Sequence, residues 1–200
     1  MVKTLSMLIH AQPVTVWSVL LDSIEDPQRY MPDVDGSSVV ERLVGGTAKE
    51  LKIGWECLVP DGFDYFVFDQ GALREIKAQK NGNDYEPGLL RSFEYESEIV
   101  RKITVRGTPY IEKYMVSKKY KDIRRKLVDH PVFSGQITIK VAPYSAQNPM
   151  SPVDLQFFIV LVPKSAWAKE VVDRENEMVL AIKTELQRIK ERAEELERST

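Results

Sequence analysis

The chain has little of the side chains that usually carry metal or covalent chemistry. Its 200 residues include one cysteine, Cys57, and two histidines, His10 and His130. One cysteine excludes an internal disulfide and is typical of a reducing compartment, so we expect a cytoplasmic protein with Cys57 as a buried apolar residue. Zinc sites need three or four suitably spaced ligands, which these histidines lack, so no metal is predicted. We expect His130 instead to shape a bend at Asp129–Pro131.

Long apolar runs and a strong net charge are also absent. The apolar run near the N-terminus is short and is interrupted by Ser6 and His10, so it predicts neither a signal peptide nor a membrane span. The formal net charge is −2 at pH 7, so nucleic acid is not expected as a partner of the whole molecule. Neither a glycine-rich phosphate loop nor a GxSxG nucleophile motif occurs, and no cofactor is predicted.

The longest regular pattern lies at the C-terminal end, from about Ser165 to Glu197. On a period of 3.6 residues, the apolar side chains fall on one side and the charged ones on the other. No glycine or proline interrupts the stretch, so it predicts one helix of roughly 45 Å that needs a broad partner surface. The apolar side contains Ala168, Val171, Val172, Met178, Val179, Ile182, Leu186, Ile189, Ala193 and Leu196. The charged side contains Lys169, Asp173, Glu177, Lys183, Glu185, Arg188, Lys190, Glu194 and Glu195.

The preceding chain predicts two short helices within a mostly β pattern. A β-compatible run at 3–11 precedes a helix at Pro13–Leu21, and the Asp26-Pro27 and Met31-Pro32 pairs bracket a second, very short helix. A strand at 37–44 is expected to end at Gly45-Gly46, and Leu89–Glu98 is compatible with another strand. Period-two alternation predicts five further strands at Ile99–Arg106, Tyr110–Ser117, Tyr120–Val128, Gly135–Ala142 and Val153–Val162.

Three stretches in this order carry a resemblance. They are residues 11–34 (AQPVTVWSVLLDSIEDPQRYMPDV), residues 99–143, with Glu112 in mid-strand, and residues 152–172 (PVDLQFFIVLVPKSAWAKEVV). They resemble the opening, the central meander and the last strand with its following helix in the Bet v 1-like/START (SRPBCC, helix-grip) superfamily. The resemblance implies an α+β fold: a curved antiparallel sheet wrapped around a long C-terminal helix, with two short helices after the first strand.

The resemblance also implies one domain over residues 1–200, with a family-atypical insertion at about 47–98. The insertion could close a cavity, extend the sheet or cover the outer face of the sheet. Phe158, Val160 and Val162 alternate away from the expected core, so that outer face is unusually apolar. Coverage by the insertion would explain this pattern, and so would a homodimer formed through the outer face or the insertion.

Two charged residues interrupt the predicted apolar surfaces. Glu175 lies within the apolar arc of the long helix, where it either reaches water at the sheet edge or faces an internal cavity. Arg125 alternates with Ile123 and Leu127, on the face of its strand directed toward the helix; the alternative is that a neighbouring basic residue turns inward. A pair between Arg125 and Glu175 would be costly to bury, so both are catalytic candidates.

The stretch from Arg101 to Lys126 is strongly basic. It contains ten lysines and arginines and two acidic residues, Glu112 and Asp122. One interpretation is a solvated sheet face. The other is a surface for docking to an acidic partner, a lipid headgroup or RNA.

The helix-grip resemblance implies a ligand cavity between the sheet and the C-terminal helix. The leading hypothesis is binding of a mostly hydrophobic, lipid- or polyketide-like small molecule. One alternative is an enzyme of the polyketide cyclase/aromatase or dehydratase type, with Glu175 and a tyrosine or Arg125 exchanging a proton. A second is a co-chaperone-like or RNA/ribosome-associated interaction protein. The predicted lining is Trp17, Tyr110, Tyr114, Ile123, Arg125, Phe133, Ile139, Phe157, Glu175, Met178 and Ile182.

Overall fold

Eight strands and three helices make up the part of the chain that the structure describes. The computed structural model describes residues 1–53, 57–60, 90–145, 147–164 and 168–199. The elements in chain order are β1 (Val2–Ile9), α1 (Pro13–Glu25), the 3-10 helix η1 (Pro27–Arg29), β2 (Val34–Ile53), β3 (Cys57–Pro60), β4 (Leu90–Val105), β5 (Thr108–Ser117), β6 (Asp122–Leu127), β7 (Phe133–Ser145), β8 (Asn148–Pro163) and α3 (Ala168–Arg198).

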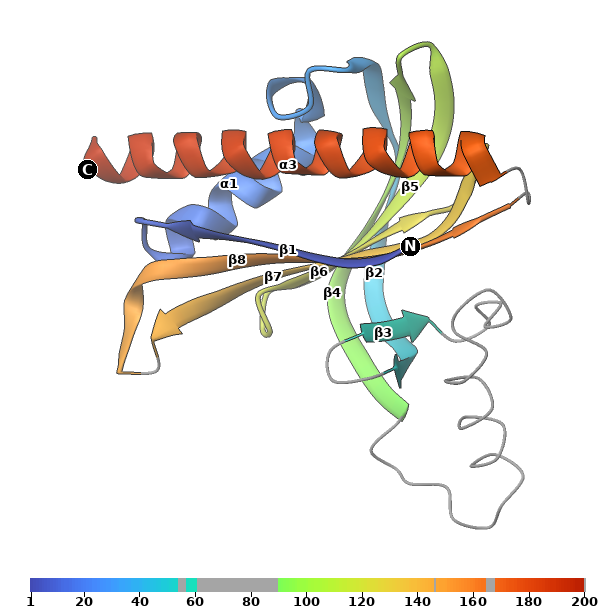
Figure 1. Cartoon of the computed structure of the whole chain (residues 1–200). Coiled ribbons are helices and arrows are strands. Elements are labelled where there is room, and N and C mark those ends of the chain that lie inside the picture. Colours follow the sequence, from blue (N-terminus) through green and yellow to red (C-terminus); the bar gives the residue numbers. More distant parts are fainter. Residues whose placement is uncertain (54–56, 61–89, 146, 165–167, 200) are drawn as a thin grey trace.

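The eight strands form one antiparallel sheet. Their order is β1-β8-β7-β6-β5-β4-β2-β3, so most neighbours in space are also neighbours in the sequence. Figure 1 shows α3 lying along one side of the curved sheet, with α1 on the same side. The architecture confirms the predicted α+β arrangement, including the short helix pair that follows the first strand. No helix in the described ranges is long and apolar enough to cross a membrane.

Both longer helices bury the faces that their apolar spacing defines. Pro13 starts α1, and the helix continues past the predicted end at Leu21 because Ile24, four residues after Leu20, extends the buried side. Helix α3 buries its apolar side from Val179 onward, whereas Val172 is 54% exposed. The buried residues of α3 include Val179, Ile182, Leu186, Ile189 and Ala193.

Strands β2 and β4 are longer than the sequence predicts. The expected end of the strand at Gly45-Gly46 is wrong, because β2 stays in register with β4 across the glycines and pairs Gly46 with Tyr95. A Cβ atom at Gly45 would lie 1.8 Å from the carbonyl oxygen of Tyr95. A close approach of two backbones of this kind requires glycine in a strand. β4 likewise joins two predicted strands into one.

The apolar outer face of the sheet is buried within the chain. Phe158, Val160 and Val162 are 4%, 3% and 5% exposed. β3 pairs with β2 at one edge of the sheet but also contacts β7 and β8, and it lies on the side opposite α3 (Figure 1). The described parts of the segment at 47–98 therefore extend the sheet, and β3 reaches its outer face. Residues 61–89 lie outside the described residues, and both the insertion and the homodimer stay predictions.

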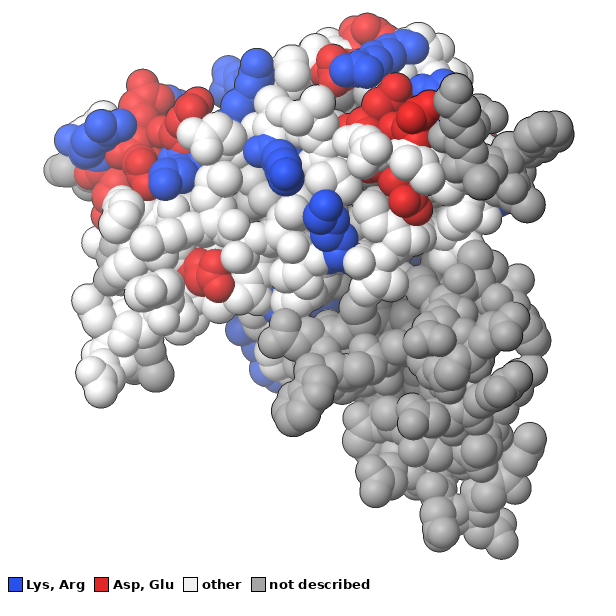
Figure 2. All heavy atoms as spheres, viewed as in Figure 1, with Lys and Arg blue, Asp and Glu red and all other residues white. Residues whose placement is uncertain are grey.

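The basic stretch is not a uniformly solvated face. Arg101, Arg124 and Arg125 are buried, and Lys113 forms an ion pair of 2.7 Å with Glu98. On the side of the molecule seen in Figure 2, acidic and basic side chains are interspersed along the upper edge. The exposed positive charge is thus smaller than the sequence count suggests.

Candidate ligand-binding site

A small cavity lies between α3 and the sheet. Its volume is about 130 Å³, and its walls come from α3, the loop after η1, the β4–β5 turn and the β6–β7 connection. The apolar part of the lining includes Met31, Val34, Val105, Phe133, Met178 and Ile182. The polar part includes Tyr110, Arg125, His130 and Glu185.

The structure divides the predicted lining into two groups. Tyr110, Arg125, Phe133, Met178 and Ile182 border the cavity. The other buried members belong to the hydrophobic core and do not border the cavity. These are Trp17, Tyr114, Ile123, Ile139 and Phe157.

Glu175 is neither a wall of the cavity nor the partner of Arg125. Its carboxylate lies 3.4 Å from the amino group of Met1 and is partly exposed, so the predicted Arg125–Glu175 pair is wrong. Arg125 does face α3 as expected, but the acid that it meets there is Glu185, at 2.9 Å. Ten residues of helix separate the two glutamates, so α3 crosses Arg125 roughly 15 Å farther along its axis than predicted.

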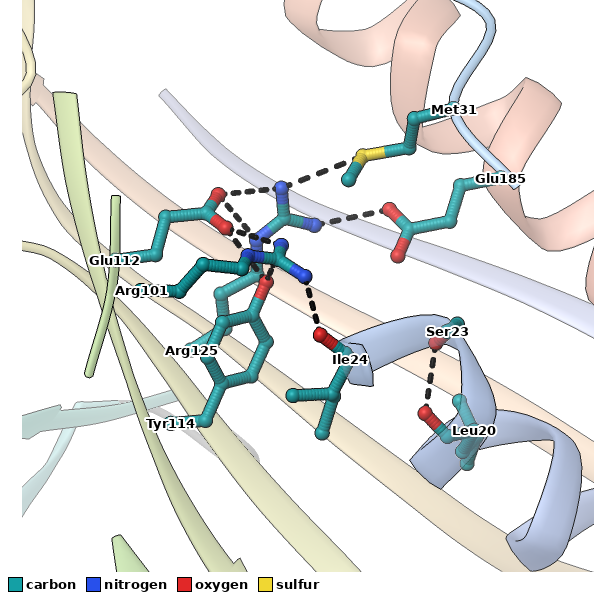
Figure 3. Close-up of polar contacts among 9 residues, drawn as sticks. All are labelled: Leu20, Ser23, Ile24, Met31, Arg101, Glu112, Tyr114, Arg125 and Glu185. Carbon is teal, nitrogen blue, oxygen red and sulfur yellow. Dashed lines mark hydrogen bonds and ion pairs between the residues drawn. The ribbon is translucent and has the colours of Figure 1, made fainter. Parts of the chain in front are cut away.

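Glu112 is the centre of a buried charge network formed by Arg101, Glu112, Tyr114, Arg125 and Glu185 (Figure 3). One oxygen of Glu112 accepts a hydrogen bond from Nε of Arg125 at 2.8 Å and forms an ion pair with Nη2 of Arg125 at 2.6 Å. The other accepts from Nη2 of Arg101 and from the Tyr114 hydroxyl, each at 2.6 Å. Both oxygens of this buried carboxylate are therefore satisfied.

Strand register explains why these groups meet. Arg101 on β4 lies directly opposite Glu112 on β5, and Tyr114 lies opposite Arg125 on β6. Residues two apart on one strand point to the same face. Alternation therefore directs all four side chains toward the side of the sheet that carries α3.

The network also ties the sheet to both long helices. Arg101 donates to the carbonyl oxygen of Ile24 in the last turn of α1 at 2.6 Å, where helix carbonyls lack internal partners. Arg125 donates to Glu185 on α3 and contacts the sulfur of Met31 at 3.6 Å. The two guanidinium groups and two carboxylates balance in charge, which buried ions require.

The protonation states of the network follow from these contacts. Burial alone would raise the pKa of Glu112, but the charges of Arg125 and Arg101 outweigh burial and lower it to about 2. Burial raises the pKa of Tyr114 well above its usual value. At neutral pH Glu112 is consequently ionised, and Tyr114 is a neutral hydrogen-bond donor.

His130 shapes the bend before β7, as the sequence predicts. Its Nδ1 accepts hydrogen bonds from the backbone nitrogens of Val132 at 3.2 Å and Phe133 at 3.1 Å. Its ring lies edge-on against Tyr110, with centroids 4.7 Å apart. Burial lowers its pKa to about 4, so the imidazole is neutral at pH 7 and carries its proton on Nε2.

Comparisons with known proteins bear on the fold. The sequence matches no protein-family model and no curated protein. Among solved structures, it is similar to the Zhui aromatase/cyclase from Streptomyces sp. R1128, with 11% identity, a TM-score of 0.55, and coverage of 97% of this chain and 93% of that one. A protein from Thermus thermophilus matches with 12% identity, a TM-score of 0.53, and coverage of 96% and 97%.

The chain has the helix-grip fold. A START superfamily protein from Mycobacterium smegmatis is also similar, with 10% identity, 98% coverage of both chains and a TM-score of 0.48. Among the described residues of this helix-grip protein, no group of three or more His, Cys, Asp and Glu side chains could hold a metal ion.

Sequence reasoning missed three members of the charge network in this helix-grip protein. Arg101 counted only toward the basic stretch, Glu112 only toward the resemblance, and Glu185 was placed on the solvated side of α3. The alternation that turned Arg125 inward applies equally to Arg101 with Ile103 and to Glu112 with Tyr114. That signal was present for the strands, whereas Glu185 gave none because it stands among other helix charges.

Proposed function

We propose that this helix-grip protein binds a small, mostly apolar molecule in the cavity between α3 and the sheet. The supporting observation is the cavity itself, with apolar walls and a few polar groups gathered at Arg125 and Glu185. This combination is typical of small-molecule sites. The fold similarity to an aromatase/cyclase favours a ligand that contains a ring.

The size of the cavity limits the ligand. At about 130 Å³, it is close to the roughly 150 Å³ engineered cavity that binds benzene, and below the roughly 300 Å³ at which drug-sized pockets begin. One ring or a short acyl segment fits this space. A complete long-chain lipid does not fit without movement of the walls.

Binding is better supported than the cyclase or dehydratase alternative. That alternative needs a group free to exchange a proton, and its candidate Glu175 does not border the cavity. The carboxylates of Glu112 and Glu185 are each held by a guanidinium group. The interaction-protein alternative drew on the basic stretch, three of whose arginines are buried.

The test is to fill the cavity. Ala181 borders it, and Ala181→Leu adds apolar volume there; Leu180, on the exposed side of the same helix, supplies the control Leu180→Ala. Titration with ethylbenzene is followed by two-dimensional NMR. We expect saturable shifts at cavity residues in the unsubstituted protein and the control, and at least a tenfold weaker response in Ala181→Leu. Ethylbenzene shifts that are absent, or unchanged by Ala181→Leu, would contradict the proposal.

A further inference from the structure

Two polar atoms at the cavity lack partners among the described residues, although their side chains are almost fully buried. Tyr110 is 6% exposed and Glu185 is 5% exposed, and both border the cavity. Oε2 of Glu185 is bound by Arg125 (Figure 3). Within the described part of the chain, neither Oε1 of Glu185 nor the Tyr110 hydroxyl has a hydrogen-bond partner. Neither atom is fully enclosed by protein, so each is open to the cavity and can form a hydrogen bond with a group placed there.

The two atoms need opposite hydrogen-bond partners: one is a donor and the other is an acceptor. Burial, together with the negative charges of Glu112 and Glu185, raises the pKa of Tyr110, so its hydroxyl stays protonated and can donate. Glu185 is held by Arg125 as a carboxylate, so its free oxygen can only accept. His130 offers no second acceptor, because its Nδ1 already receives two backbone N–H groups.

Among the described residues that line the cavity, each arginine is already paired with an acidic side chain. Arg125 binds both Glu112 and Glu185. At the mouth, Arg106 pairs with Asp33 at 2.9 Å and Arg174 pairs with Glu177 at 3.0 Å. A carboxylate brought to the buried end of the cavity would lie beside Glu185, where like charges repel.

We propose that the ligand places a neutral hydroxyl group between Tyr110 and Glu185. This hydroxyl accepts a hydrogen bond from the Tyr110 hydroxyl and donates one to the Glu185 carboxylate. The ligand class is therefore a ring-sized phenol or alcohol, in preference to a carboxylic acid or a plain hydrocarbon. The inference rests on the proposed binding function and adds the chemistry of the ligand's polar end. A carboxylate cannot donate to Glu185, an ammonium group cannot accept from Tyr110, and a hydrocarbon leaves both atoms unsatisfied.

Three probes that share one ring size test the proposal: 4-ethylphenol, ethylbenzene and 4-ethylbenzoate. Dissociation constants at pH 7 come from NMR titration of the full chain. We expect 4-ethylphenol to bind at least tenfold more tightly than either other probe, since a site built for a hydroxyl rejects analogues that lack it.

A substitution assigns the preference to Tyr110. Tyr110→Phe removes only the hydroxyl, and we expect it to abolish most of the preference for 4-ethylphenol over ethylbenzene. Tyr30→Phe is the matched control, because the Tyr30 hydroxyl binds Asp22 at 2.6 Å and does not border the cavity. Its preference should equal that of the unsubstituted protein.

The outcomes separate this inference from the proposed function. Equal affinities for 4-ethylphenol and ethylbenzene would contradict the proposed role of the ligand hydroxyl and leave the proposed binding in the cavity unaffected. Tightest binding of 4-ethylbenzoate would overturn it in favour of an anionic ligand. An unchanged preference in Tyr110→Phe would remove Tyr110 from the site, and failure of all three probes to bind would overturn the proposed function.

Discussion

At the scale of single residues, the charge network places two arginines and two glutamates in the core, where isolated charges are very costly. Glu112 reduces this cost by binding both Arg101 and Arg125. Removing one member of such a network leaves uncompensated charge, and that loss usually exceeds the net benefit of the intact pair. The network is consequently sensitive to substitutions that preserve side-chain shape.

Glu112→Gln should reduce the free energy of unfolding by about 3–5 kcal/mol, because two guanidinium groups lose their shared counter-ion. Urea denaturation followed by circular dichroism gives the value. The control is Glu25→Gln, which removes the exposed ion pair to Arg42 and should cost less than about 1 kcal/mol. A Glu112→Gln loss no larger than that of the control would contradict the role of Glu112.

His130 and Glu112 should make stability depend on pH in two different ranges. The pKa of His130 falls from 6.5 to about 4 on folding, so the unfolded chain binds a proton first and stability declines as pH drops from about 6.5 to 4. The pKa of Glu112 falls from 4.5 to about 2, so its contribution is present above pH 4.5 and is lost as pH drops through about 2.

His130→Asn separates the two ranges. Asparagine does not titrate and can still accept a backbone N–H two residues on, as in an Asx turn. Urea denaturation at a series of pH values should show that the decline between about 6.5 and 4 weakens while the decline below 4.5 stays. An unchanged profile in the upper range would show that other groups cause it.

At the residue scale, the sequence predicted the face on which a side chain lies better than the residue with which it pairs. Alternation placed Arg125 on the inner face, and this is confirmed. The partner was wrong because the crossing point of a helix over a sheet depends on packing of the whole core. No local pattern distinguishes Glu185 from the other charged residues of α3.

At the scale of elements, the end of α3 stabilises the start of α1. Helix α1 has no side-chain cap from its own N-cap residue, Gln12. Glu197 from α3 instead accepts from the Gln12 backbone nitrogen at 3.2 Å and from the Thr15 hydroxyl at 2.7 Å. A carboxylate at a helix N-terminus is favoured by the helix dipole as well as by these bonds.

Glu197→Ala should cost about 1 kcal/mol, the usual value of a lost N-terminal cap. Hydrogen exchange should quicken at the first amides of α1 and not at those in the middle of the sheet. The control is Glu195→Ala, which removes an exposed pair to Arg192 on the same helix. Equal exchange in both variants would contradict the capping role.

Element types were predictable where a period was sustained, and element ends were not. The 3.6-residue period of α3 and the alternation of β5 to β8 predicted these elements correctly. Gly45-Gly46 read as a strand end because glycine usually marks one. Here the pair continues β2, since the reason for glycine is the close approach of β4, which no local sequence shows.

At the scale of the whole molecule, the sheet buries side chains on both of its faces. α1 and α3 cover the inner side, while Phe158 on the outer side is 4% exposed within one chain. The apolar outer face therefore needs no second copy to be buried. Homodimerisation stays a prediction, and a dimer would have to form through other surfaces.

Phe158→Ala should lower the free energy of unfolding by about 3–5 kcal/mol, as for other large-to-small core substitutions. Sedimentation of the same samples should show an unchanged oligomeric state. A substitution that dissociated a dimer at little cost to the folded chain would instead assign Phe158 to a subunit interface.

The overall fold was accessible from sequence because a helix-grip architecture needs one long amphipathic helix and a regular meander. The cavity was not, because it is the volume that packed side chains fail to fill. Trp17, Ile139 and Phe157 were expected around it and belong to the packed core instead.

The bond between Arg125 and Glu185 has a consequence for motion. A slide of α3 by one turn, about 5.4 Å, would bring Ala181 or Ile189 to the guanidinium, so Arg125 would lose Glu185 and keep only Glu112, which Arg101 shares. Translation of the helix along its axis therefore costs a buried ion pair, whereas a tilt about Glu185 keeps that pair. Any widening of the cavity that admits a ligand should therefore proceed as a tilt of α3 about Glu185.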